Sequence, residues 1–374
     1  MNKKILFLTG TRADFGKLHP LMDIVESSSN FECYIFVTGM HTLKRYGSTY
    51  HEITKSHYEN IQIFKNQNYN TSSEKILSNT INGLKKYVQK IKPDMIVVHG
   101  DRIETLAGAI VGSFNNILVC HIEGGELSGT VDELIRHAVT KLSHIHFVAN
   151  IEAKNRLIQL GEIKKSIHII GSPDIDVMRR ETLPTLEHVK SYYGIEFSEY
   201  AILIFHPVVT ELSSISTQIN TILSCLRKEK INFIVILPNN DPGSEKIFAA
   251  YNSLDSEKFL IFPSIRFQYF LTLLKNANYI IGNSSAGIRE AEVYGTPTIN
   301  IGSRQFNRSS NKNIINISSK KNDIKNAINS ITGKRFLPRN NFGNIKNSDK
   351  KFIEKLNNKK TWNISIQKQF IDFR

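Results

Sequence analysis

The chain alternates short runs of β-branched and aromatic residues with polar, helix-favouring segments, and this alternation restricts the fold more than any other feature. Most of the runs are apolar throughout, which is typical of parallel strands covered on both faces. Parallel neighbours need a crossover connection, usually a helix. The sequence therefore predicts an α/β fold with doubly wound, Rossmann-like sheets.

The strand-like runs fall into two sets. The first set is expected at 3–9, 31–38, 94–100, 117–123, 144–150 and 167–171, and the second at 200–207, 231–238, 259–263, 278–283 and 296–302. A polar segment without strand pattern, 176–194, separates them. Because 374 residues is long for one domain, we predict two Rossmann-like domains that face each other across a cleft, 1–178 and 179–360.

The net charge of +14 is distributed unevenly, and this bears on possible partners. Residues 311–374 hold 15 Lys and Arg against 4 Asp and Glu, and the rest of the chain is nearly neutral. The basic residues follow a helix-like spacing without interleaved aromatic residues, so we interpret them as a solvated face and predict no nucleic-acid partner. Such a face would also help to hold a phosphorylated substrate.

Targeting signals are not recognisable in the sequence. No apolar run approaches the roughly 18 residues that span a bilayer, so no membrane association is predicted. The N-terminal apolar run stops at Thr9 and leads into a charged turn, unlike a secretory signal. Cys33, Cys120 and Cys225 are widely spaced and form no CxxC pair, which favours reduced thiols. We expect a cytoplasmic protein.

Polar residues gather where strands end, which is where open α/β sheets bind ligands. After the first strand, Arg12 and Lys17 lie in the turn and helix start GTRADFGKL (10–18). This turn is not a P-loop, because Leu18 stands where Ser or Thr would hold magnesium, and no GxGxxG fingerprint supports NAD binding. The two cations suit a phosphate at a helix N-terminus, although solvated cations on a structural turn are the alternative.

Carboxylates follow the third and fourth strands of the first set. Asp101 opens a helix, where it is either a helix cap or a functional group. Glu123 ends a buried strand before two glycines, and a carboxylate there is costly unless paired or used. Asp132 and Arg136 share one helix face, as a surface ion pair or as part of the same site. Together these residues indicate acid/base chemistry.

Metal binding is weighed for the same region, because His-x-Asp, His-x-Glu and His-x-His pairs occur at 99–101, 121–123 and 144–146. No HExxH pattern or Cys/His cluster completes a site, so no metal is predicted.

In the second domain, small and hydroxyl residues follow a strand and precede a helix at 283–287, which predicts a diphosphate cradle. Its candidate ligand-binding residues are Ser284, Ser285 and Gly287. Glu290 is expected to accept hydrogen bonds from ribose hydroxyls. His206, at another strand end, is expected to reach a phosphate or the sugar. Phe270 either packs on a base or belongs to the core.

These residues carry a family resemblance. GTRADFGKL, VTGMH, HGDR, HIEGGELSG, GSPD, FHP, PNND and NSSAGIREA together resemble the hydrolysing UDP-N-acetylglucosamine 2-epimerases of bacterial sialic-acid biosynthesis, over essentially the whole chain. The resemblance implies a fold of the glycosyltransferase-B type, in which the C-terminal domain holds most of the nucleotide. It also implies that a terminal helix, 361–374, packs back on the first domain.

The resemblance further implies conversion of UDP-N-acetylglucosamine and water to N-acetylmannosamine and UDP, with neither NAD nor a metal as cofactor. It assigns Asp101, Glu123 and Asp132 as the catalytic carboxylates. It assigns sugar-nucleotide contacts to Arg12, Lys17, Arg136, His206, Ser284, Ser285, Glu290 and Arg308. Two departures from the related non-hydrolysing enzymes stand out: the third carboxylate is Asp132 instead of Glu, and the opening turn reads GTRAD instead of GTRPE. We expect a homo-oligomer, a dimer or tetramer.

The implied reaction needs carboxylates because the C2 hydrogen of the sugar is barely acidic. UDP leaves C1 in an anti elimination to 2-acetamidoglucal, and water then adds at C1 while a proton reaches C2 from the other face. Asp101 or Asp132 would handle the C2 proton, and Glu123 the complementary transfer or the ring charge. The alternatives are a hydrolysing epimerase for UDP-2,4-diacetamido-2,4,6-trideoxy sugars, a non-hydrolysing epimerase and a glycosyltransferase.

Overall fold

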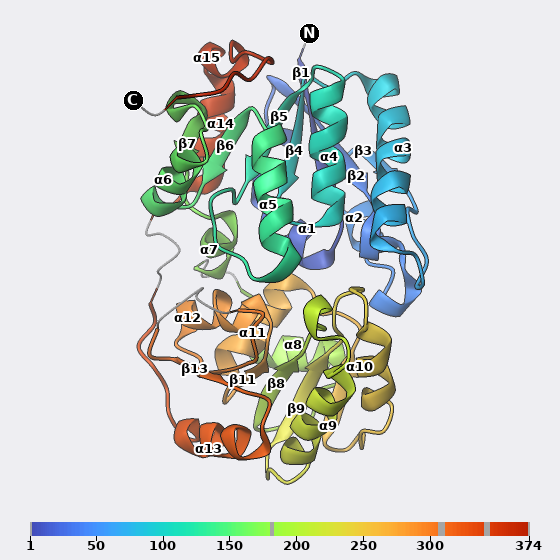
Figure 1. The fold of residues 1–374 in the computed structure, drawn as a ribbon, viewed down its shortest axis with the longest axis vertical. Coiled ribbons are helices and arrows are strands. Elements are labelled where there is room, and N and C mark those ends of the chain that lie inside the picture. The colour runs from blue at the N-terminus through green and yellow to red at the C-terminus, as the bar shows by residue number, and fades with distance from the viewer. Residues whose placement is uncertain (1, 180–182, 306–310, 340–344, 373–374) are drawn as a thin grey trace. The chain divides into compact units, whose positions relative to one another are not determined.

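The computed structural model describes residues 2–179, 183–305, 311–339 and 345–372. The chain divides into two compact units. The first unit comprises 1–126, 131–177 and 342–374, and the second comprises 127–130 and 178–341. Each unit is built on one parallel β-sheet with helices on its faces (Figure 1). This confirms the predicted α/β class.

The first sheet has seven strands in the order β3-β2-β1-β4-β5-β6-β7, and all pairs are parallel. Its strands are β1 (Lys3–Thr9), β2 (Phe31–Val37), β3 (Asn60–Ile63), β4 (Met95–His99), β5 (Leu118–Ile122), β6 (Ile145–Val148) and β7 (Ile167–Ile169). The strand order reverses direction between β1 and β4. Ligands of doubly wound folds bind at such a switch point.

Helices cover both faces of the first sheet, which explains why its strands are apolar without alternation. Ile5 and Phe7 of β1 belong to one buried cluster, and Leu6 and Leu8 belong to another. The helices of this unit, or at its border, are α1 (Arg12–Glu26), α2 (Tyr50–Thr54), α3 (Ser73–Ile91), α4 (Ile103–Phe114), α5 (Thr130–Leu142), α6 (Ile151–Gln159), α7 (Pro173–Met178), α14 (Ser348–Asn357) and α15 (Lys359–Trp362).

The second sheet has six strands in the order β10-β9-β8-β11-β12-β13, again all parallel. Its strands are β8 (Tyr200–Ile204), β9 (Asn232–Ile236), β10 (Phe259–Phe262), β11 (Ile280–Gly282), β12 (Thr298–Ile301) and β13 (Ile314–Ile317). The helices are α8 (Leu186–Tyr193), α9 (Ile215–Leu226), α10 (Ser244–Tyr251), α11 (Phe267–Asn276), α12 (Glu290–Tyr294) and α13 (Lys321–Ile331). Here the switch point lies between β8 and β11.

The C-terminal segment differs from the sequence-based expectation. Residues 342–374 group with the first unit, whereas 342–360 was expected in the second domain. The helices are α14 and α15, so the expected terminal helix over 361–374 is wrong for 363–372, which is not helical. The non-helical course has a physical reason: it leaves the carbonyl oxygen of Ile366 available for a hydrogen bond outside its own segment. That oxygen lies 3.1 Å from His144 Nε2.

The packing of α14 shows how this segment is held. The Phe352 ring lies 4.9 Å from that of Phe147 on β6 and 6.3 Å from that of Phe7 on β1. Phe352 is fully buried, and burying such a side chain contributes about 1.5–3 kcal/mol. Within the described residues, no helix is long and apolar enough to cross a membrane.

Candidate functional site

In the first unit, the turn that follows β5 places Glu123 in an unusual backbone conformation. Glu123 has a φ of 63°, in the left-handed region that residues other than glycine seldom adopt. Gly125 follows at 74°, and a Cβ there would lie 2.2 Å from the Ala153 carbonyl oxygen. The turn therefore requires glycine at 125 and strains the backbone at Glu123. Strain of this kind is concentrated at functional sites.

His99, the last residue of β4, lies between two carboxylates. Its Nδ1 is 2.7 Å from Asp14 Oδ1, and its Nε2 is 3.4 Å from Glu123 Oε2. Burial disfavours the charged imidazolium, but the Glu123 charge and the Asp14 hydrogen bond outweigh it and raise the pKa of His99 to about 10. A charged imidazolium at neutral pH therefore lies beside Glu123.

Lys17 brings a second cation to Glu123. Its Nζ lies 4.0 Å from Glu123 Oε1 and 3.4 Å from Asp174 Oδ2, and the Asp174 side chain is completely buried. Lys17 lies in the second turn of α1, so the helix carries it from the β1 turn towards the end of β5. Lys17, which was predicted to bind a phosphate, therefore contacts two carboxylates of the first unit.

Arg136 links the two predicted catalytic turns. Its Nη2 donates to Asp101 Oδ2, and its Nη1 donates to the main-chain oxygen of Glu123. Arg136 is buried and projects from α5. The cap of α4 is Arg102, which makes no side-chain cap hydrogen bond, so the helix-cap interpretation of Asp101 is wrong.

The remaining predicted residues of this unit take separate positions. Asp132 is half-buried in the first turn of α5, one turn before Arg136. Arg12 begins α1 and forms an ion pair with Glu52, with Nε 3.1 Å from Oε2. Described contacts therefore connect four predicted residues into one cluster: Asp101 to Arg136, Arg136 to Glu123, and Glu123 to Lys17. The contact of Arg12 is instead with Glu52 on α2.

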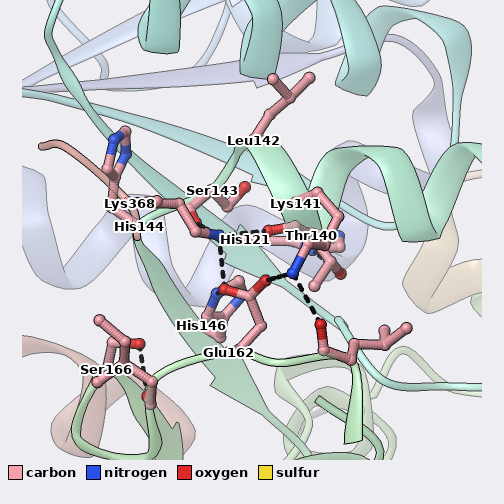
Figure 2. A network of polar contacts seen from close by, with 12 residues as sticks. His121, Thr140, Lys141, Leu142, Ser143, His144, His146, Glu162, Ser166 and Lys368 are labelled. Carbon is pink, nitrogen blue, oxygen red and sulfur yellow. Dashed lines mark hydrogen bonds and ion pairs between the residues drawn. The ribbon is translucent and has the colours of Figure 1, made fainter. Parts of the chain in front are cut away.

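The first unit also contains a buried polar network that contacts the last turn of α5 (Figure 2). Lys368 Nζ, from the C-terminal segment, donates to the carbonyl oxygens of Ser143 at 2.7 Å and Thr140 at 3.2 Å. It also pairs with Glu162, which accepts from His146 Nε2 at 3.0 Å. Burial raises the pKa of Glu162, but His146 and Lys368 outweigh it and lower that pKa to about 2.

The network continues to the Asp101 turn through His121. The His121 Nδ1 lies 3.3 Å from Thr140 Oγ1, and its Nε2 lies 2.9 Å from the carbonyl oxygen of Gly100. Burial lowers the pKa of His121 to about 3, so the ring is neutral. A chain of contacts therefore runs from Lys368 to the residue before Asp101.

The second unit has its own polar cluster at its switch point. Asn283 Oδ1 accepts from the His206 main-chain nitrogen at 2.6 Å, and Asn283 Nδ2 donates to the His206 carbonyl oxygen at 2.8 Å. These bonds join the ends of β8 and β11. The Asn239 main-chain nitrogen donates to His206 Nδ1 at 3.0 Å, which places the imidazole hydrogen on Nε2.

The predicted cradle forms a tight helical turn. Ser284 caps it by accepting from the Ala286 nitrogen at 3.3 Å, and Ser285 to Gly287 form the turn itself. A Cβ at Gly287 would lie 2.8 Å from Thr298 Cγ2. Glu290 follows at the start of α12 and is buried.

Two predicted residues of the second domain remain, Phe270 and Arg308. Phe270 is buried on α11, in agreement with its alternative interpretation as a core residue. Arg308 lies outside the described residues.

Asp14, His99 and Asp174 are not among the site residues predicted from the sequence. His99 is considered there only as a metal ligand, and Asp174 appears only as the last letter of GSPD. Asp14 follows β1 and His99 ends β4, on the two sides of the switch point, and this position is the signal that could have identified them. Among the described residues, no group of three or more His, Cys, Asp or Glu side chains forms a metal site.

Two Rossmann-like sheets with polar clusters at both switch points define a two-domain α/β protein of the glycosyltransferase-B type. The chain belongs to the UDP-N-acetylglucosamine 2-epimerase family, whose model matches residues 23–363. This confirms the family predicted from the motifs.

Individual relatives agree with this assignment. The UDP-N-acetylglucosamine 2-epimerase of Neisseria meningitidis serogroup B is 49% identical over 373 residues, 99% of each chain. The hydrolysing UDP-N,N'-diacetylbacillosamine 2-epimerase of Legionella pneumophila is 34% identical over 322 residues, 85% of each chain. The Methanocaldococcus jannaschii UDP-GlcNAc 2-epimerase, solved with UDP-GlcNAc and UDP, superposes with a TM-score of 0.76 at 22% identity, covering 94% of this chain and 99% of that one. This last likeness concerns the fold alone.

Proposed function

We propose that the protein is a hydrolysing 2-epimerase that converts UDP-N-acetylglucosamine and water to N-acetylmannosamine and UDP, the first step of sialic-acid biosynthesis. The observation that carries this proposal is the cluster at the first switch point, where Glu123 lies beside the His99 and Lys17 cations and Asp101 is paired with Arg136. The 49% identity to a UDP-N-acetylglucosamine 2-epimerase over the full length supports the same substrate.

The reaction proceeds in two steps. First, a base removes the C2 proton, the electron pair of the C2–H bond forms the C1=C2 double bond, and the C1–O bond breaks as UDP leaves. Second, the oxygen of water bonds to C1 while C2 receives a proton on the opposite face. The product is N-acetylmannosamine, and the sum of the two steps consumes one water and no oxidant.

The carboxylates have distinct surroundings, which supports distinct roles. Asp101 accepts a hydrogen bond from the Arg136 guanidinium, which favours the ionised carboxylate that a base needs, so we assign to Asp101 the removal of the C2 proton. Glu123 lies between two cations, and the imidazolium of His99 is a source from which its proton can be replaced. We assign to Glu123 the proton transfer on the other face. Asp132, half-buried one turn from Arg136, completes the three carboxylates.

The leaving group acquires negative charge as the C1–O bond breaks, so donors at the diphosphate accelerate the elimination. In the second unit, we assign this contact to the turn from Ser284 to Gly287 and to His206, whose Nε2 carries the imidazole hydrogen. Glu290 would accept hydrogen bonds from the ribose. Arg12 and Arg308 would supply further positive charge.

A second substrate is favoured by one observation. The Legionella relative that acts on UDP-N,N'-diacetylbacillosamine is 34% identical over 85% of each chain. Incubation with either UDP-sugar, followed by ³¹P NMR for free UDP and chromatography of the sugar, separates the candidates. We expect UDP and N-acetylmannosamine from UDP-N-acetylglucosamine. An intact UDP-sugar with inverted C2 would instead indicate the non-hydrolysing reaction, and turnover of only the diacetamido sugar would reassign the substrate.

The role of Glu123 is tested by Glu123→Gln. We expect UDP affinity to change by less than about threefold and turnover to fall by at least about a thousandfold, within the range of a lost acid/base group and charge. Glu133→Gln is the matched control, since Glu133 lies on α5 and pairs with His137 at 3.2 Å. Turnover of Glu123→Gln at the control's rate would refute the role.

A further inference from the structure

The first unit contains a cavity of about 380 Å³ at its edge strand, between β7 and the C-terminal helices. Its volume lies within the range of small-molecule sites. The residues that line it are Lys165, His168, Lys355, Asn358, Lys360, Thr361, Asn363 and Ile364. One wall is formed by η3 (Lys164–Ser166) and β7, and the other by α14, α15 and the residue pair after α15.

The lining of this cavity is positively charged. Three lysines line it, and no Asp or Glu is among the described residues that do so. Lys355 pairs with Glu354 at 3.0 Å, but the Glu354 side chain is 68% exposed, so water largely screens that pair. Lys165 and Lys360 are exposed, and no ion pair to them is described. The cavity therefore presents a concentrated positive potential.

His168, in the middle of β7, reports on this potential. Its Nε2 is enclosed and has no hydrogen-bond partner among the described residues. Burial and the charges of Lys355 and Lys154, together with His146, lower the pKa of His168 to about 4. The imidazole is therefore neutral next to lysines, of which Lys355 has only the largely exposed Glu354 as a described carboxylate partner, and an anion in the cavity would stabilise the protonated form of His168.

The cavity is separate from the carboxylate cluster. Lys165 precedes β7, so this wall lies at the amino end of a strand, whereas His99, Asp101 and Glu123 lie at or just after the carboxyl ends of parallel strands. The two sites thus lie at opposite strand ends of the first sheet: the cavity at the amino ends and the carboxylate cluster at the carboxyl ends. The role of the cavity does not depend on the proposed epimerase activity.

The polar neutral residues restrict the ligand further. Asn358 and Asn363 bring side-chain amides, and Thr361 brings a hydroxyl that donates to the Lys355 carbonyl oxygen at 2.6 Å. Lysines bind phosphate as point charges, and amides bind hydroxyl groups. From this lining we propose that the cavity is a binding site for a small phosphorylated molecule of about the size of a sugar phosphate.

The first test uses glucose 6-phosphate and inorganic pyrophosphate as probes, with excess UDP to occupy the nucleotide site. Calorimetry compares the wild type with Lys165→Glu/Lys360→Glu. The matched control is Lys86→Glu/Lys90→Glu on α3, which changes the net charge equally at exposed positions. We expect the cavity variant to weaken binding at least tenfold and the control to stay within twofold.

Other outcomes overturn the proposal. Equal weakening in both double variants would mean that only the net charge matters, and absence of binding to the wild type would exclude the site. The comparison between variants does not require UDP to bind. Failure of the cavity proposal is therefore distinguishable from failure of the epimerase proposal. Turnover of UDP-N-acetylglucosamine is measured separately for each variant.

The second test measures ligand binding on the wild-type chain and uses a variant only to assign one signal. In ring-labelled protein, the His168 signal is assigned by its loss in His168→Gln. With glucose 6-phosphate bound, we expect the pKa of His168 to rise by about one unit, because the anion favours the imidazolium. A His168 signal that does not respond to the ligand would contradict binding in this cavity.

Discussion

Lys368 and Glu162 are 206 positions apart in the chain, and their side chains meet at 2.5 Å inside the first unit. The Glu162 side chain is 1% exposed, and Lys368 also donates to two carbonyl oxygens in the last turn of α5 and just after it. A cation at this position suits the negative end of a helix. The pair fixes the non-helical C-terminal segment to the helix that carries Arg136 (Figure 2).

Lys368→Met should therefore destabilise the protein by about 1–3 kcal/mol, because Glu162 keeps its buried charge and loses one partner. Lys359→Met is the control, since Lys359 is exposed on the same segment. Urea denaturation at pH 7 measures both. Equal stability of the two variants would show that the pair does not hold the segment.

The same pair has a defined pH dependence. The folded-state pKa of Glu162 is lowered from 4.5 to about 2, so its stabilisation is present above pH 4.5 and is lost as the pH falls towards 2. The difference in unfolding free energy between the wild type and Lys368→Met should shrink over that interval. A difference that stays constant from pH 6 to pH 2.5 would contradict the assignment.

Arg136 joins Asp101 to the backbone of Glu123, which makes a conservative substitution informative. Arg136→Lys retains the charge but loses the planar, forked donors. We expect kcat to fall by at least about tenfold, which corresponds to about 1.4 kcal/mol of barrier, with UDP affinity little changed. Arg156→Lys is the control, since Arg156 donates to the Gly125 carbonyl oxygen at 3.0 Å. Steady-state kinetics measures kcat of both variants. An equal fall of kcat in both would contradict a specific requirement for the hydrogen bond between Arg136 and Asp101.

His99 should remain protonated well above neutral pH. Its pKa is raised from 6.5 to about 10, so its contribution to stability is complete below pH 6.5 and is lost as the pH rises through 10. Ring-labelled histidine NMR, with assignment by His99→Gln, should show an imidazolium at pH 8. A neutral ring at pH 8 would exclude His99 as the proton source beside Glu123.

Gly125 tests the strained turn. An added Cβ would lie 2.2 Å from the Ala153 carbonyl oxygen in a backbone with positive φ, so Gly125→Ala should destabilise the protein by more than about 2 kcal/mol. Gly194→Ala is the matched control, because Gly194 has a φ of 63° and no atom within 4 Å of an added Cβ. It should cost about 1 kcal/mol. Thermal or urea unfolding measures the stability of both variants. Equal losses of stability would show that the backbone shifts to accommodate the added Cβ at position 125.

Much of the fold could be predicted because central parallel strands are apolar on both faces. Each of the eleven predicted runs contains a strand, but β3 and β13 were missed. β3 (Asn60–Ile63) is a partly exposed edge strand with two polar residues, and β13 (Ile314–Ile317) is an edge strand in an Asn-rich segment. These two edge strands lack the continuous apolar pattern on which the prediction depends, whereas the edge strands β7 and β10 lie within predicted runs.

The site was predictable to the extent that its residues follow strands. Glu123 and Asp101 were found from their place at strand ends, and their partners Lys17 and Arg136 were also predicted site residues, but His99 and Asp174 were not. His99 and Asp174 become partners only because β4, β5 and α7 bring distant segments together, and no local spacing encodes that. The C-terminal helix was misplaced for the same reason: the course of 363–372 is determined by contacts with His144 and Glu162.

The most direct measurement is the reaction in deuterated water with UDP-N-acetylglucosamine, followed by ¹H and ³¹P NMR. Elimination and hydration predict free UDP together with N-acetylmannosamine that carries deuterium at C2, because the C2 hydrogen is replaced by solvent. Glu123→Gln should yield neither product. Release of UDP with a sugar that retains its C2 hydrogen, or an epimerised sugar still bound to UDP, would contradict the account.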